Sequence, residues 1–234
     1  MTNQTTRIMK TNMTNRLGRL MAGTMLPFLF LSCGGPTGQG ARESAAADTL
    51  WLFNGRDLTG WEFFHREEAD PGTVWSVDQG VLCCAGMPFG YARSAEVHAD
   101  YVLNLEWRWP SEPTNSGVFI HLQEEDAIWP VCYEAQMMHG RAGDLIAMGD
   151  SDFLERTDKS RRIVPRLHEE SSENPPGEWN TYRIIARGDS LLVYVNGVLE
   201  NRASGLNYRS GSIGLQSEGG PIEFRNIYLV REPL

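Results

Sequence analysis

The sequence has little of what several common protein classes require. Its four cysteines include no Cys-x-x-Cys pair, which excludes a zinc knuckle. Only 21 Lys and Arg stand against 30 Asp and Glu, so the net charge is -9. Nucleic-acid binding needs clustered basic residues, and nucleic acid is therefore not an expected partner. No stretch shows a long helical period and no motif recurs at a fixed interval, which disfavours a helical fold and a propeller.

A long apolar run is also missing. The run Leu20–Leu31 is shorter than the roughly 20 residues that a membrane-spanning helix needs. It follows a basic stretch without acidic residues and ends at Ser32-Cys33-Gly34. This order predicts a lipoprotein signal peptide over residues 1–33, cleaved before a Cys33 that carries acyl chains. A plain signal peptide and an uncleaved anchor are the alternatives.

The residues behind Cys33 fit an exported protein tethered to a membrane. Residues 34–48 are rich in Gly, Ala and Ser, which predicts a flexible tether, and leaves 49–234 as the globular part. We expect a periplasmic or cell-surface protein held to the membrane by its lipid anchor only. Two states of the remaining cysteines stay open: one disulfide from Cys132 to Cys83 or Cys84, or buried free thiols.

From Leu50 onward, short stretches alternate apolar and polar residues. In residues 102–109 four apolar side chains, from Leu103 to Trp109, fall on one face of a strand. Further strands are predicted at 117–122, 133–138, 181–187, 191–195, 212–216 and 222–230. Strands without intervening helices predict one antiparallel, all-β domain, a sandwich or jelly roll. The polar stretch from His139 to Trp179 either forms loops at the mouth of a site or is a surface loop without a functional role.

Several motifs resemble those of one family and occur in its order. They are Leu52-Phe53-Asn54-Gly55-Arg56-Asp57-Leu58-Thr59-Gly60-Trp61, Asn115-Ser116-Gly117-Val118-Phe119-Ile120, Tyr133-Glu134-Ala135-Gln136, Gly214-Leu215-Gln216-Ser217-Glu218-Gly219 and Phe224-Arg225-Asn226-Ile227. Over about residues 50–232 the chain resembles the 3-keto-disaccharide hydrolase domain, also called the 3-keto-glucoside-1,2-lyase/3-keto-2-hydroxyglucal hydratase domain. The resemblance implies a concanavalin-like jelly roll and a 3-keto-glycoside or oligosaccharide substrate. No cofactor is expected.

The implied reaction needs a base and an acid. A ketone at C3 acidifies the hydrogen on C2, so a base removes it, the C1 substituent leaves, and water adds back. Glu134 is the first candidate for acid/base work, with His121 and Glu218 as the other catalytic candidates. His121 stands where many relatives carry Arg, and a structural histidine at a strand end is the alternative.

Substrate-binding candidates come from the same motifs and the neighbouring loops. They are Gln136, Gln216, Arg93, Asn115, Trp129, His139 and Arg141. Strand alternation places Glu134 with Gln136, and Gln216 with Glu218, on one face. We therefore expect these four residues and His121 to converge on one concave face, with Trp129 stacking on a sugar ring. No calcium-loop spacing is present, so no metal is expected.

Two other functions stay open. A non-catalytic carbohydrate-binding module uses the same fold. A retaining glycosidase of this class usually carries two Glu four residues apart on one strand, and the stretch from Glu134 to Met138 has one acid only. The glycosidase is therefore the weaker of the two.

Overall fold

The computed structural model describes residues 48–231. The predicted signal peptide, the predicted lipidation site Cys33 and the predicted tether up to residue 47 lie outside this part. Among the described residues the only α-helix is α1 (Pro71–Val74), which Asp70 caps by accepting a hydrogen bond from the Gly72 amide. No helix in this part of the chain has the length and apolar character needed to cross a membrane.

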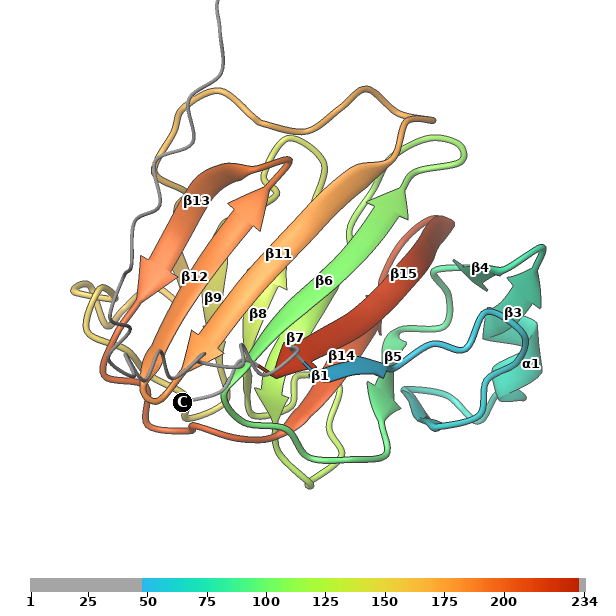
Figure 1. The fold of residues 1–234 in the computed structure, drawn as a ribbon, viewed down its shortest axis with the longest axis horizontal. Helices are drawn as coiled ribbons and strands as arrows, with labels where there is room; N and C mark the ends of the chain where they lie inside the picture. The colour runs from blue at the N-terminus through green and yellow to red at the C-terminus, as the bar shows by residue number, and fades with distance from the viewer. Residues whose placement is uncertain (1–47, 232–234) are drawn as a thin grey trace, which may run out of the picture. The chain divides into compact units, whose positions relative to one another are not determined.

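One sheet has eight strands. Seven run in the order β13-β12-β11-β6-β15-β4-β3, and β1 also pairs with β15 (Figure 1). Their bounds are β1 (Asp48–Trp51), β3 (Trp75–Asp78), β4 (Val81–Cys84), β6 (Tyr101–Arg108), β11 (Asn180–Arg187), β12 (Ser190–Val195), β13 (Val198–Ala203) and β15 (Ile222–Arg231).

The other sheet has seven strands in the order β10-β9-β8-β7-β14-β5-β2. Their bounds are β2 (Trp61–His65), β5 (Gly90–Ser94), β7 (Gly117–Leu122), β8 (Cys132–Gln136), β9 (Leu145–Met148), β10 (Ile163–Val164) and β14 (Ser212–Ser217). Because β14 inserts between β5 and β7, a late segment of the chain lies beside the central motif. We call this layer the site sheet.

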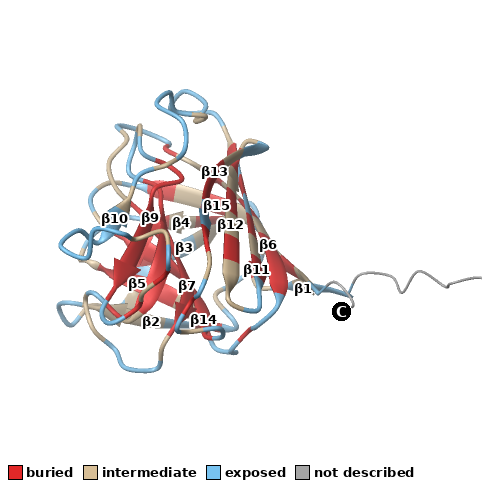
Figure 2. Cartoon of the chain, turned by 90° about the vertical axis from the view of Figure 1, so that its left-hand side faces the viewer, coloured by how far each residue is buried: buried red, intermediate tan, exposed pale blue. Residues whose placement is uncertain are grey.

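The main core lies between the two sheets, which face each other as layers (Figures 1 and 2). Leu103, Leu105 and Trp107 of β6 are buried in it, as the alternation predicts, and Tyr133 and Ala135 of β8 belong to the same core. Every ladder among the described strands is antiparallel. The predicted all-β, antiparallel sandwich is confirmed.

A second, smaller apolar cluster lies on the outer face of the site sheet. Its buried members are Tyr91, Phe119, Leu122, Cys132, Ile146 and Met148. Phe119 of β7 pairs with Glu134 of β8, so the cluster shares a face with the predicted site residues. Cys83, Cys84 and Cys132 are all free thiols, which decides the open question on a disulfide.

Candidate functional site

Two strands of the site sheet supply the carboxyl and amide groups of a pocket. On β8, Glu134 and Gln136 point outward while Tyr133 and Ala135 are buried in the main core. On β14, Gln216 points the same way, and Glu218 follows just past the strand end, where it bridges to Asn115. Residues from distant parts of the chain thus meet on one face.

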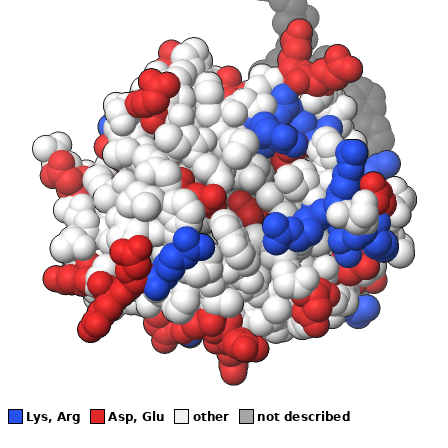
Figure 3. All heavy atoms as spheres, turned by 180° about the vertical axis from the view of Figure 1, so that it is seen from behind, with Lys and Arg blue, Asp and Glu red and all other residues white. Residues whose placement is uncertain are grey.

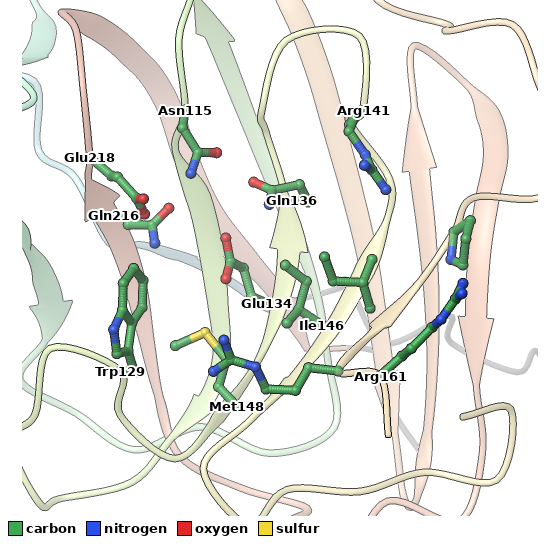
Figure 4. A pocket seen from close by; sticks show the side chains of 13 residues that line it. Asn115, Trp129, Glu134, Gln136, Arg141, Ile146, Met148, Arg161, Gln216 and Glu218 are labelled. Carbon is green, nitrogen blue, oxygen red and sulfur yellow. The ribbon is translucent and has the colours of Figure 1, made fainter. Parts of the chain in front are cut away.

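These groups line a cavity of about 530 Å³. Its walls are formed by Asn115, Trp129, Glu134, Gln136, Arg141, Ile146, Met148, Arg161, Arg162, Ile163, Pro165, Gln216 and Glu218. Figure 4 shows Glu134, Gln216 and Glu218 converging on one space, with Trp129 on one side and Arg141 on the other. Seven of the ten residues predicted from the sequence for catalysis or substrate binding are in this set.

Glu134 is the most buried carboxyl group in the pocket wall, with 2% of its surface exposed. Its pKa rises to about 8 because burial disfavours the charged form and Glu218 adds a like charge, while the Arg162 charge acts in the opposite direction. Gly117 lies on the neighbouring strand β7, diagonally across from Glu134, and a Cβ there would collide with Oε1 of Glu134. Glu134 is therefore protonated at neutral pH. Its side chain occupies space that any residue other than glycine at position 117 would fill.

Glu218 has a different environment. It is half-buried, and burial raises its pKa, while a hydrogen bond with the Asn115 side chain and the Arg66 charge lower it. The site thus combines a fully buried carboxyl group with a partly solvated one. Such a difference in environment is how enzymes divide acid and base roles between two carboxyl groups.

The amide side chains offer both kinds of hydrogen-bonding group. Oε1 of Gln136 accepts hydrogen bonds from the backbone amides of Met137 and Met138, each at 3.0 Å. Its NH2 group therefore remains as a donor for a ligand. Oε1 of Gln216 and Oδ1 of Asn115 are buried without a hydrogen-bond partner in the described structure, so they remain as acceptors. Buried polar groups of this kind suit a ligand rich in hydroxyls.

The rim of the pocket is basic on one side and aromatic on the other. Oδ2 of Asp144 accepts from Nε of Arg141 at 2.7 Å and pairs with Nη2 at 2.6 Å, and Oδ1 accepts from the Arg166 amide at 2.9 Å. These contacts fix the Arg141 guanidinium at the wall. Trp129 is 42% exposed, which leaves its ring accessible to a ligand. Figure 3 shows this face, with acidic atoms near the middle and basic atoms on both sides of them, more of them on the right of the view.

His121 does not reach the pocket, and the expectation that it shares the concave face is wrong. Its φ of 53° lies in the left-handed region and interrupts the strand alternation. The ring packs between the sheets against Tyr101 and Tyr133, with centroids 5.8 and 6.3 Å away. Nδ1 lies 3.1 Å from the Tyr208 carbonyl oxygen, and burial lowers the pKa of His121 to about 4. It is a neutral core histidine.

Two predicted binding residues also lie outside the pocket wall. Arg93 donates to Glu62 at 3.0 Å, to Asp126 at 3.1 Å and to the Glu124 carbonyl at 3.2 Å. It thereby holds the loop that carries Trp129 instead of facing a ligand. His139 is not among the wall residues, and its Nδ1 lies 3.8 Å from a carboxylate oxygen of Glu173.

Sequence reasoning missed six wall residues. Ile146 and Met148 come from β9, a run of four apolar residues whose length gives no alternation to read. Arg161, Arg162, Ile163 and Pro165 come from the polar stretch between His139 and Trp179. That stretch does contribute to the mouth of the pocket, but only its pairing with β9 shows which residues do so. Within residues 48–231, no group of three or more His, Cys, Asp and Glu side chains could hold a metal ion.

Comparisons with known proteins agree with this geometry. The family described as 3-keto-alpha-glucoside-1,2-lyase-like domain matches residues 50–230. A comparison with curated protein sequences finds no match.

Solved structures show the same fold. A Parabacteroides distasonis ATCC 8503 protein assigned to the glycosyl hydrolases is 20% identical, with a TM-score of 0.58 over 78% of this chain and 93% of its own. A Bacillus licheniformis beta-glucanase is 13% identical, with a TM-score of 0.53 over 82% and 100%. Carbohydrate binding module CBM66 from Bacillus subtilis is 12% identical, with a TM-score of 0.53 over 72% and 94%. These likenesses confirm the concanavalin-like jelly roll.

Proposed function

Because this chain belongs to the 3-keto-alpha-glucoside-1,2-lyase-like domain family, we propose that it cleaves glycosides whose sugar already carries a ketone at C3. The observation that carries the proposal is the pair of carboxyl groups in one pocket, Glu134 buried and Glu218 partly solvated. The two environments suit one proton donor and one proton acceptor at neutral pH.

The reaction begins with proton transfer from C2. Glu218 takes the proton, the C–H electron pair forms the C2=C3 bond, and the carbonyl π pair moves to the oxygen on C3. The enolate then re-forms the ketone and the C1=C2 bond, and the C1–O bond breaks. The leaving oxygen keeps that electron pair and takes the proton of Glu134. Water next adds across C1=C2, with hydroxide on C1 and a proton on C2, so that the net change is hydrolysis.

The remaining groups bind and orient the sugar. The Gln136 NH2 group donates, the Gln216 and Asn115 oxygens accept, and the Trp129 ring stacks on an apolar sugar face. The fixed Arg141 guanidinium donates from the rim. We also propose that the protein is exported and anchored by lipid on Cys33, as its first 33 residues predict.

A carbohydrate-binding module is the second candidate. Its support is the similarity to CBM66 in fold, together with an exposed tryptophan and amides at the pocket. A module of this kind binds unoxidised sugar and changes nothing in it. The raised pKa of Glu134 favours the enzyme, because strongly shifted pKa values are typical of groups that transfer protons in active sites.

The deciding experiment incubates the purified protein with a 3-keto disaccharide and, in parallel, with the unoxidised disaccharide. In D2O we expect free sugar with deuterium at C2 from the oxidised substrate only. Glu134→Gln and Glu218→Gln are each expected to lower kcat by about 10²–10⁴-fold. Glu125→Gln, which alters an exposed loop carboxylate, is the matched control. Binding of both sugars without turnover would establish the module instead.

A further inference from the structure

Arg162 is the wall residue with the least compensated charge. Its backbone carbonyl accepts a hydrogen bond from the Ala147 amide at 2.9 Å, which fixes the main chain beside β9. Its side chain lines the same cavity as Glu134. The residue just before the edge strand β10 thus places one guanidinium at the pocket.

The neighbouring guanidinium groups already have carboxylate partners. Arg141 is paired with Asp144 through two nitrogens, and Arg161 lies 3.5 Å from Asp158. For the Arg162 guanidinium, the part of the chain from 48 to 231 supplies no ion pair and no hydrogen bond. Its five N–H donors and its full charge are therefore available to a ligand.

The pocket itself does not neutralise this charge. Glu134 is the carboxyl group that the Arg162 charge reaches, and burial keeps it protonated at neutral pH. The Glu218 carboxylate has Arg66 as its basic neighbour. A cation that faces a cavity without an anion of its own suits a ligand that brings or develops negative charge there.

The proposed reaction develops such a charge on one atom. The oxygen on C3 is a neutral carbonyl in the substrate and an anion in the enolate. A donor that binds the anion more strongly than the carbonyl lowers the barrier without tightening substrate binding. Building on the proposed function, we propose that Arg162 is the oxyanion site of the pocket and binds the C3 oxygen of the enolate.

Kinetics of four variants test this role. Arg162→Gln removes the cation and Arg162→Lys keeps it. Arg161→Gln changes the adjacent, paired arginine, and Arg202→Gln removes an exposed charge from β13 in the other sheet. We expect Arg162→Gln to lower kcat on a neutral 3-keto glycoside by about 10²–10³-fold with KM changed less than about threefold. Arg162→Lys should recover part of this loss in kcat. The loss in Arg161→Gln should be at least about tenfold smaller than the loss in Arg162→Gln. Arg202→Gln should have the kcat of wild type.

The pH profile gives a readout that a purely structural role would not move. The charged and titratable groups around the pocket are Glu134, Glu218, Arg66, Arg141, Arg161 and Arg162. Because the Arg162 charge lowers the pKa of Glu134, its removal should move the alkaline limb of activity to higher pH. An unmoved alkaline limb together with an unchanged kcat would overturn the oxyanion site.

A binding arm separates this inference from the proposed function. Ascorbate, whose anion is a stable ring enolate, serves as the probe in calorimetry. We expect wild type and Arg202→Gln to bind ascorbate with equal affinity, and Arg162→Gln to bind it at least about tenfold more weakly. If wild type fails to turn over 3-keto glycosides yet binds ascorbate through Arg162, the reaction is wrong and the oxyanion site stands.

Two other outcomes overturn the inference. The first is equal ascorbate affinity of wild type and Arg162→Gln, or no binding by either. The second is an Arg162→Gln effect confined to the KM of glycosides that carry a carboxylate or sulfate, which would make Arg162 a binding group for a fixed anionic substituent. Circular dichroism of each variant verifies that the protein is folded before either arm is read.

Discussion

Replacing Glu134 with Gln should change how stability depends on pH. In the folded protein the pKa of Glu134 is about 8, against 4.5 for an unperturbed glutamate, because burial and the Glu218 charge disfavour ionisation. Between these two values the folded chain keeps the proton and the unfolded chain releases it. The stability of wild type therefore falls as pH rises through this window, and the contribution of the neutral carboxyl is lost above about pH 8. Glutamine is nearly isosteric with the protonated acid and does not titrate.

The magnitude follows from the two pKa values. They differ by about 3.5 pH units, from 4.5 to about 8, and each unit corresponds to about 1.4 kcal/mol. The free energy of unfolding of Glu134→Gln minus that of wild type should thus increase by about 5 kcal/mol from pH 4.5 to 8. A domain is typically stable by about 5–15 kcal/mol, so the change is large enough to measure.

Urea unfolding followed by circular dichroism, at half-unit steps across this pH range, measures the difference directly. Glu125→Gln, at an exposed loop position, is expected to follow wild type. A difference between Glu134→Gln and wild type that stays flat would refute the reasoning. It would mean that Glu134 ionises in the folded protein, and its assignment as the proton donor would fall with it.

Three more outcomes follow from contacts in the site sheet and from the N-terminal motif. Gly117→Ala should cost about 1–3 kcal/mol of unfolding free energy and most of the activity, because the new Cβ collides with Glu134; urea unfolding and turnover measure both. His121→Asn should destabilise the protein by about 1–3 kcal/mol and leave kcat near wild type, since its ring lies in the main core; a kcat loss beyond about tenfold would contradict this placement. Cys33→Ala should move the protein from the membrane fraction to the soluble fraction on immunoblots, and retention in the membrane would point to another anchor.

Strand parity predicted the part of the site that lies on regular strands. Glu134 and Gln136 share a face because Tyr133 and Ala135 must be buried between the sheets, and a one-residue slip would exchange the two sets. The same rule fails at His121, where a left-handed backbone conformation at the strand end turns the side chain into the core. Alternation in a sequence carries no sign of such a change.

The basic wall of the pocket could not be read from the sequence for a different reason. Arg162 reaches the cavity because residues 163–164 pair with β9, and this two-residue strand is too short to show a pattern. Arg93 presents the opposite case. Its motif suggested a ligand contact, but its guanidinium donates hydrogen bonds to Asp126 and Glu62 and thereby anchors a loop. Whether an arginine serves a ligand depends on which carboxylates the fold brings to it, and that is decided by contacts between segments far apart in the chain.

Contacts between distant segments also give the two carboxyl groups of the pocket different environments. Glu134 lies in the middle of a central strand, under Gly117 and beside Phe119, so its neighbours remove water and favour the protonated form. Glu218 lies past the end of β14, where partial burial raises its pKa, while Asn115 and the Arg66 charge act in the opposite direction and support the ionised form. The carboxyl group in the middle of a strand is less solvated than the one past a strand end, because neighbouring strands cover the first on both sides. A fold that holds both beside a single cavity can therefore keep an acid and a base ready at the same pH.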